Sequence, residues 1–89
     1  MSSKVPDQHH VKDLHEAALL YAHGQRLSGL RKEGKFYWFV FSGKQKCRKL
    51  SDQYWAGEIQ VSAKAYSDAI KTLKTRIFLT SEEEKHEGV

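Results

Sequence analysis

The densest run of apolar side chains lies near the middle of the chain, where five of its ten aromatic residues fall within positions 36–41. Aromatic and β-branched residues favour the pleated, half-buried surface of a strand, so this run predicts a strand from Lys35 to Ser42. Alternate side chains of a strand face opposite ways. Two apolar rows result: Phe36, Trp38 and Val40 on one face, and Tyr37, Phe39 and Phe41 on the other.

Two apolar rows on one strand are compatible with three arrangements. Helices cover both faces, or a helix covers one face and a partner subunit the other, or one row is open, as in modules that stack unpaired bases on a sheet. We favour a covered strand, because a domain of 89 residues has a small core whose stability depends on a few large side chains.

Polar and apolar positions predict two helices around this strand. The first covers about Leu14–His23, where Asp13 is placed to cap the start and Gly24 to end the helix. The second covers Gly43–Trp55, and Ser42 is its predicted N-cap. Cys47 falls on the inward stripe of the second helix, which predicts that this residue serves as a small hydrophobe.

A third helix is predicted to follow Ser62, which is placed to cap it. Its apolar stripe is the clearest of the three: Tyr66, Ala69, Ile70, Leu73 and Ile77. A weaker strand at Gln25–Arg31 is predicted to form a hairpin with the aromatic strand, with Gly34 in the turn. Glu58–Val61 is extended and is predicted to be a short third strand or a docked connector.

The predicted fold class is therefore α+β, in the order helix, strand, strand, helix, short strand, helix, with helices packed on a sheet of two or three strands. Residues 11–79 are predicted to form a single domain. Residues 1–10 are predicted to be a flexible N-terminus, and residues 80–89 an acidic disordered tail.

Composition narrows the class of protein. Hydrophobic residues make up 39% and charged residues 29% of the chain, which is typical of a folded soluble domain and not of a disordered one. No apolar run has the length of a signal peptide or a transmembrane helix, and Cys47 has no second cysteine to pair with. We therefore expect a cytoplasmic protein with no membrane partner.

The formal charge of +4 is unevenly distributed. Residues 1–24 carry −1 and residues 78–89 carry −3, whereas twelve basic and four acidic residues between positions 25 and 77 give +8. Four of these cations lie in the first two turns of the second predicted helix, where the helix dipole disfavours positive charge. The candidate sites for an anionic partner are Lys44, Lys46, Arg48 and Lys49, with Arg31, Lys32 and Lys35 at the hairpin.

No catalytic signature, metal-ligand spacing or cofactor loop occurs in the chain. The five histidines, at positions 9, 10, 15, 23 and 86, lack the cysteine or acidic partners of a zinc site. We therefore expect no enzyme activity, no metal, no cofactor and no small-molecule substrate. The charge pattern favours a small non-enzymatic module whose basic surface binds nucleic acid. The alternative interpretation of the basic residues is solvation of an ordinary surface.

A second functional hypothesis is a protein-interaction module, either a homodimer or a phage-borne adaptor or inhibitor of a host protein. Its contact surface would be an aromatic face of the sheet, because tryptophan and tyrosine dominate the energetics of interfaces. The candidate anchors are Tyr37, Trp38 and Trp55.

Four short motifs carry a resemblance to a known family. They are a Leu-Tyr-Ala-x-Gly helix end at 20–24, a Phe-Val-Phe strand at 39–41, a Tyr-Trp-x-Gly at 54–57 and a Leu-Lys pair at 73–74. With these motifs, residues 14–78 resemble a small bacterial and phage domain family of unknown function. The resemblance implies a bacterial or phage setting, but no activity and no binding residue.

Overall fold

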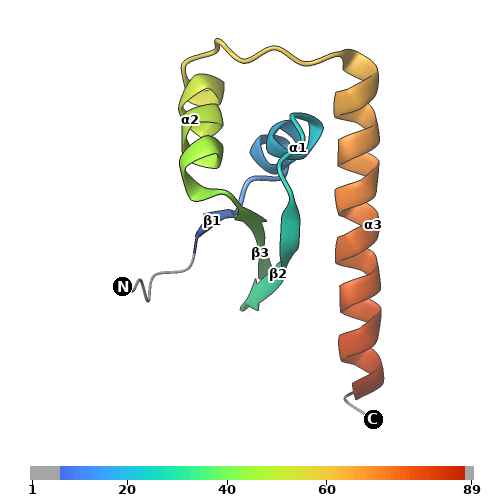
Figure 1. Cartoon of the computed structure of the whole chain (residues 1–89). Coiled ribbons are helices and arrows are strands. Elements are labelled where there is room, and N and C mark those ends of the chain that lie inside the picture. The colour runs from blue at the N-terminus through green and yellow to red at the C-terminus, as the bar shows by residue number, and fades with distance from the viewer. Residues whose placement is uncertain (1–6, 88–89) are drawn as a thin grey trace.

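The computed structural model describes the backbone of residues 7–87 and the side chains of residues 7–82. Over these residues the chain forms three helices and an antiparallel sheet of three strands, so the predicted α+β class is confirmed (Figure 1). The elements in chain order are β1 (Gln8–Val11), α1 (Leu14–Ala22), β2 (Leu27–Glu33), β3 (Phe36–Ser42), α2 (Lys44–Trp55) and α3 (Ala63–Glu87).

The aromatic strand is the centre of the sheet, whose strand order is β1-β3-β2. Its partner β2 belongs to the predicted hairpin, and Gly34 has the positive φ of 62° that the tight turn requires. The other partner, β1, was not predicted, because residues 1–10 were expected to be flexible. β1 pairs His10 with Val40 and Val11 with Phe39. This pairing joins segments that are far apart in the chain. The local sequence of β1, four residues that include two histidines, does not predict a strand.

A bulge in β2 reconciles its sequence with the sheet. Leu27 and Leu30 are three residues apart, so regular alternation would send them to opposite faces. Pairing shifts by one residue at Ser28, which places Leu27 opposite Phe41 and Leu30 opposite Phe39. Both leucines therefore face the same side as the core phenylalanines.

The core lies on one face of the sheet. Phe39 and Phe41 pack there with Leu20 of α1 and Leu73 of α3, and all four are at most 2% exposed. α1 lies between α2 and α3 in Figure 1, and all three helices contribute buried residues to the same cluster. Among the described residues, the helices therefore cover the row of Phe39 and Phe41. Along the opposite row the exposure varies: Phe36 is exposed, Trp38 is half-buried and Val40 is buried.

Two of the three predicted helix caps are confirmed. The carboxylate of Asp13 accepts hydrogen bonds from the backbone N–H groups of His15 and Glu16, and Ser62 Oγ accepts one from Ala65. The third prediction, that Ser42 caps α2, is wrong. The residue before α2 is Gly43, which has a φ of 83° and makes no side-chain cap.

The N-terminus of α2 is capped instead by Asp7, from the segment leading into β1. Its Oδ1 accepts a hydrogen bond from the N–H of Lys44 at 2.9 Å, and its carbonyl accepts one from Gly43 at 3.2 Å. A carboxylate at this position stabilises the positive end of the helix dipole. The cap was missed because the two partners are 37 residues apart.

Of the two alternatives predicted for Glu58–Val61, the structure shows the connector: the segment forms no strand and joins α2 to α3. The prediction for the C-terminal segment differs from the structure. α3 continues to Glu87, across most of the segment 80–89 that was expected to be a disordered tail. Extending a helix that is already nucleated costs little, and the Glu-rich sequence after Ser81 consists largely of good helix formers.

Candidate functional site

The sheet face that points away from the helices carries a mixed aromatic and charged surface. In register across the strands, Arg31 pairs with Trp38, Glu33 with Phe36, and His10 with Val40. Lys12 follows two residues after His10 and reaches the same surface. We call this surface the open sheet face and define it by His10, Lys12, Arg31, Glu33, Phe36 and Trp38.

The two aromatic rings of the open sheet face are accessible but held in place. Phe36 is 58% exposed and Trp38 is half-buried. Trp38 Nε1 donates a hydrogen bond of 2.6 Å to Glu33 Oε1, which fixes the orientation of the indole. The Lys12 ammonium lies 4.5 Å from the centroid of the Phe36 ring and 5.4 Å from that of Trp38, within the range of a cation–π interaction.

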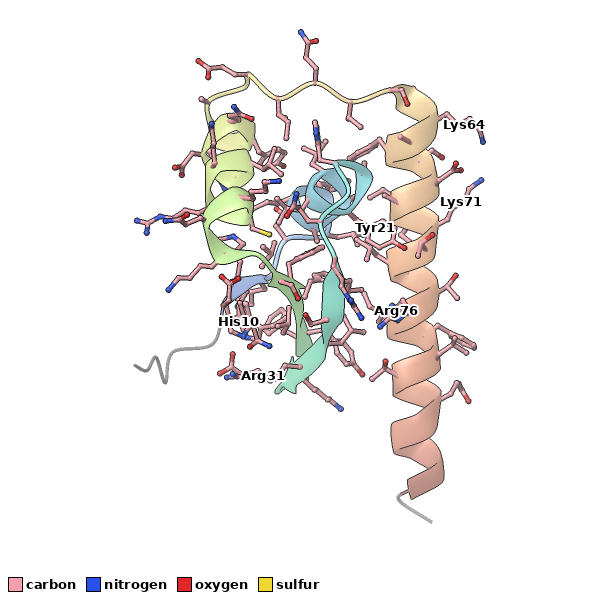
Figure 2. All side chains as sticks on the ribbon, viewed as in Figure 1. His10, Tyr21, Arg31, Lys64, Lys71 and Arg76 are labelled. Carbon is pink, nitrogen blue, oxygen red and sulfur yellow. The ribbon has the colours of Figure 1, made fainter. Side chains whose placement is uncertain are left out.

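A shallow pocket of about 270 Å³ lies beside Trp38 and is lined by His10, Arg31 and Glu33. Figure 2 shows His10 and Arg31 close together at the sheet. Lys12 and Arg31 carry positive charge around the aromatic rings, and Glu33 carries the opposing negative charge. The open sheet face can therefore contact both the planar face of a ligand ring and an anionic group next to it.

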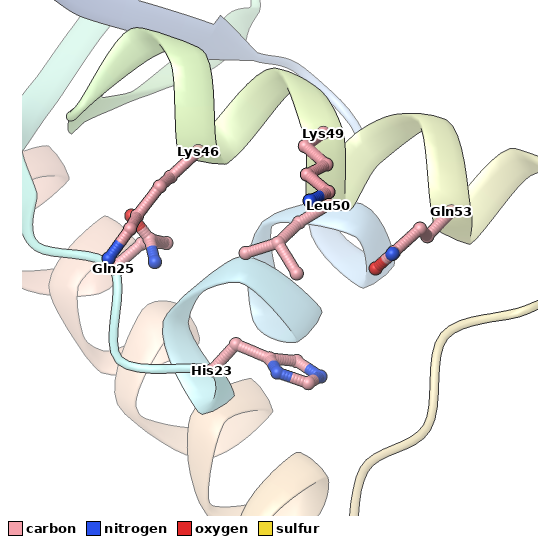
Figure 3. A pocket seen from close by; sticks show the side chains of 6 residues that line it. All are labelled: His23, Gln25, Lys46, Lys49, Leu50 and Gln53. Atoms are coloured by element: carbon pink, nitrogen blue, oxygen red, sulfur yellow. The ribbon is translucent and has the colours of Figure 1, made fainter.

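The cations predicted on α2 do not lie on the open sheet face. Lys46 and Lys49 line a separate pocket of about 320 Å³ with His23 and Gln25, between α2 and the end of α1 (Figure 3). Figure 3 shows Lys46 extending from α2 toward Gln25. Leu50 and Gln53 complete the lining, so this pocket combines two cations and polar side chains with an apolar group.

Lys44 and Arg48 lie on the other flank of α2, near β1. Their charges help to lower the pKa of His9, although burial of the imidazole is the larger cause. His9 Nε2 is 3.2 Å from Ser51 Oγ, which joins β1 to α2. The four cations of α2 are therefore divided between two flanks and do not form one continuous stripe.

The three hairpin cations are also separated. Arg31 lies on the open sheet face opposite Trp38, whereas Lys32 pairs with Tyr37 on the helix side of the sheet, and Lys35 lies in the turn. Of the seven cations predicted to bind an anion, Arg31 is thus the one that the sheet register places beside Trp38 on the open sheet face.

The predicted protein-interaction anchors lie on different surfaces. Tyr37 shares the helix-facing side of β3 with Phe39 and is half-buried, while Trp38 belongs to the open sheet face. Trp55 ends α2 and is 68% exposed. The three residues therefore do not form one flat aromatic interface.

Three histidines connect elements of the fold. Besides the contact of His9 with Ser51, His15 Nδ1 hydrogen-bonds the hydroxyl of Tyr66, which ties α1 to α3. His23 Nε2 donates to the carbonyl of Gln60 at 2.8 Å, which ties the end of α1 to the α2–α3 connector. Within the part of the chain that the structure describes, no group of three or more metal-ligating side chains occurs.

Cys47 is fully buried, as its position on the inward stripe predicted. Its Sγ lies 3.4 Å from the carbonyl oxygen of Ser42, and burial raises the pKa of the thiol. A thiol that is buried and harder to ionise is a poor nucleophile.

Sequence reasoning missed His10, Lys12 and Phe36 as members of a site. The alternation of outward His10 and Lys12 with inward His9 and Val11 is a strand signal, but a segment this short is also compatible with a loose terminus. Phe36 was placed on the correct row, but the sequence did not indicate which of the two rows the helices cover.

No helix among residues 7–87 is long and apolar enough to cross a membrane. Comparison with known proteins gives no match to a family model, a curated protein or a solved structure. The resemblance to a bacterial and phage domain family therefore stays a prediction.

Proposed function

We propose that this protein is a small non-enzymatic module that binds single-stranded nucleic acid on its open sheet face. The observation that carries the proposal is an accessible aromatic pair, the exposed Phe36 and the half-buried Trp38, beside the cations Lys12 and Arg31. Unpaired bases stack on aromatic side chains of a sheet, and nearby cations neutralise the phosphates.

The spacing of the two rings favours a single strand over a duplex. Phe36 and Trp38 are two residues apart on one strand, so their positions differ by about 6.8 Å along β3. Stacked bases of one duplex strand are about 3.4 Å apart along the axis, half that distance. Two neighbouring bases reach both rings only when they are unstacked, as in an extended single strand.

Lys12 has two roles in this proposal. In the free protein its ammonium lies over the Phe36 ring, where a base would stack. A bound base displaces the ammonium, which is then available to a phosphate of the same strand. Arg31, on the strand at the other side of Trp38, supplies a second cation, and its planar group suits phosphate oxygens.

The first test is removal of the two rings. Phe36→Ala and Trp38→Ala should each weaken binding of a fluorescent oligo-dT or oligo-U by roughly 5- to 150-fold, since a base–aromatic stack contributes about 1–3 kcal/mol. Fluorescence anisotropy at low salt measures the affinity. Phe78→Ala is the matched control, because Phe78 is 61% exposed on α3 and should be replaced without effect on binding.

The salt dependence of the binding affinity indicates how many cations neutralise phosphates. For single strands the slope of log K against log salt is about −0.7 per neutralised phosphate, so Lys12 and Arg31 alone predict a slope of about −1.4. All seven of the cations predicted from the sequence would give about −4.9. Lys46→Gln with Lys49→Gln should leave the slope unchanged if the open sheet face acts alone.

Glu33→Gln gives an expected gain of affinity. The amide oxygen of glutamine still accepts the Trp38 hydrogen bond, whereas the negative charge that repels phosphate is removed. We expect binding to tighten by roughly 2- to 5-fold, the range for an exposed charge pair of about 0.5–1 kcal/mol. Affinity that is unchanged in the Phe36 and Trp38 variants, or stronger binding to duplex than to single strands, would refute the proposal.

We also propose a cytoplasmic setting, since nucleic acid is the partner and the buried Cys47 suits a reducing compartment. The bacterial or phage origin implied by the sequence motifs is part of the same proposal.

A further inference from the structure

A carboxylate lies among the cations of the open sheet face. Glu33 is exposed at the end of β2, on the same face as Arg31 two residues earlier and opposite Phe36 in the sheet. A negative charge at this position repels phosphates, so affinity for a nucleic-acid backbone does not account for it. The hydrogen bonds that the carboxylate can accept indicate a different role.

Glu33 is fixed against the ring on which a base would stack. Its Oε1 accepts the 2.6 Å hydrogen bond from Trp38 Nε1, so the carboxylate is held at the edge of the indole. An ionised carboxylate has about four lone-pair sites on its two oxygens, and this bond uses one of them. The second oxygen and the remaining lone pair of Oε1 are acceptors for a ligand at Trp38.

The pocket of about 270 Å³ beside Trp38 brings these acceptors together with hydrogen-bond donors. Glu33 and Arg31 both line it. Arg31 is directly opposite Trp38 in the sheet register, and its guanidinium carries five N–H donors, enough to contact a phosphate and a base. Pockets for drug-sized ligands have volumes of about 300–1,000 Å³, so this smaller pocket suits one base rather than a whole nucleotide.

We propose that the base bound at Trp38 is guanine in preference to the other bases and that Glu33 selects it, an inference that rests on the proposed function of the open sheet face. The Watson–Crick edge of guanine offers two adjacent donors, N1–H and the N2 amino group, next to the acceptor O6. The carboxylate accepts from both donors, and Arg31 donates to O6. Bases of a single strand expose this edge to side chains.

The other bases place an acceptor against the carboxylate. Adenine and cytosine each have one amino group beside a ring nitrogen that accepts, and thymine and uracil have one N–H between two carbonyl oxygens. Each of these edges donates one hydrogen bond to Glu33 and turns a lone pair toward its negative charge. Bidentate contacts to a base discriminate by roughly 5- to 150-fold against the wrong base, so the preference is measurable.

Fluorescence anisotropy with two octamers tests the inference on the unchanged protein. One is an alternating dG/dT octamer, and the other has deoxyinosine in place of dG. Hypoxanthine, the base of inosine, is guanine without the N2 amino group, so both octamers present a purine to the Trp38 ring. We expect the dG octamer to bind at least about fivefold tighter at low salt, because it donates one more hydrogen bond to a charged acceptor.

Glu33→Gln tests the carboxylate itself. The amide oxygen keeps the Trp38 hydrogen bond, whereas the amide nitrogen presents donors to the donors of guanine. The ratio of the two affinities should therefore fall to about one, while binding of oligo-dT tightens because the charge is lost. Glu58→Gln, which removes an exposed carboxylate from the α2–α3 connector, should leave the ratio unchanged. Circular dichroism checks that each variant is folded.

The outcomes separate this inference from the proposed function. Equal binding of the two octamers through Phe36 and Trp38, or a ratio that Glu33→Gln leaves in place, overturns guanine selection alone. If no oligonucleotide binds, or if Phe36→Ala and Trp38→Ala leave the affinity unchanged, the proposed function and the inference that rests on it are both overturned.

Discussion

The cap that Asp7 provides for α2 leads to a sharp prediction about stability. Replacing Asp7 by Ala removes the acceptor of the 2.9 Å hydrogen bond from the Lys44 N–H and the negative charge at the positive end of the helix. Loss of an N-cap costs about 1 kcal/mol, and loss of the charge–dipole interaction about 0.3–1 kcal/mol. We therefore expect Asp7→Ala to lower the free energy of unfolding by about 1.3–2 kcal/mol.

Two matched variants separate the contributions. Asp7→Asn keeps an oxygen acceptor but not the charge, so it should lose only the dipole part, about 0.3–1 kcal/mol. Ser42→Ala removes the residue that the sequence alone nominates as the cap. Since the Ser42 hydroxyl instead hydrogen-bonds Ser28 at 2.7 Å on an exposed part of the sheet, this variant should cost less than about 0.5 kcal/mol.

Urea unfolding followed by far-UV circular dichroism measures all three variants. With an m-value of about 1–1.5 kcal/mol/M, Asp7→Ala should lower the urea midpoint by about 0.9–2 M. The cap reasoning is refuted if Ser42→Ala costs as much as Asp7→Ala, or if Asp7→Ala leaves the midpoint in place.

Two further predictions concern pH and the core. The pKa of His9 is lowered in the folded protein, so the unfolded chain binds more protons below about pH 6.5. The free energy of unfolding should therefore fall as the pH drops below that value. Unfolding midpoints measured between pH 5 and pH 8 should depend less on pH for His9→Gln than for the unchanged protein. Leu73 is fully buried on α3, so Leu73→Ala should lower the free energy of unfolding in urea by about 3 kcal/mol. Leu79 is 52% exposed on the same helix, so Leu79→Ala should lower it by under about 1 kcal/mol. Equal losses would show that α3 is not docked through Leu73.

The sequence by itself determined the elements whose signals are local. The aromatic run favoured a strand, Gly34 permitted the tight turn that pairs it with β2, and Asp13 and Ser62 capped the helices that follow them. In each case the deciding interaction joins residues within about one turn or one hairpin, so the pattern of side chains contains the information.

The tertiary structure decided what depends on residues far apart in the chain. Both rows of β3 are apolar, and only the docking of α1 and α3 shows that the Phe39 row is buried while Phe36 of the other row is exposed. β1 exists because it pairs with β3, about thirty residues away, and that pairing brings Lys12 over the Phe36 ring. Sequence patterns do not predict such contacts, because these contacts stabilise the fold only when distant segments pack together.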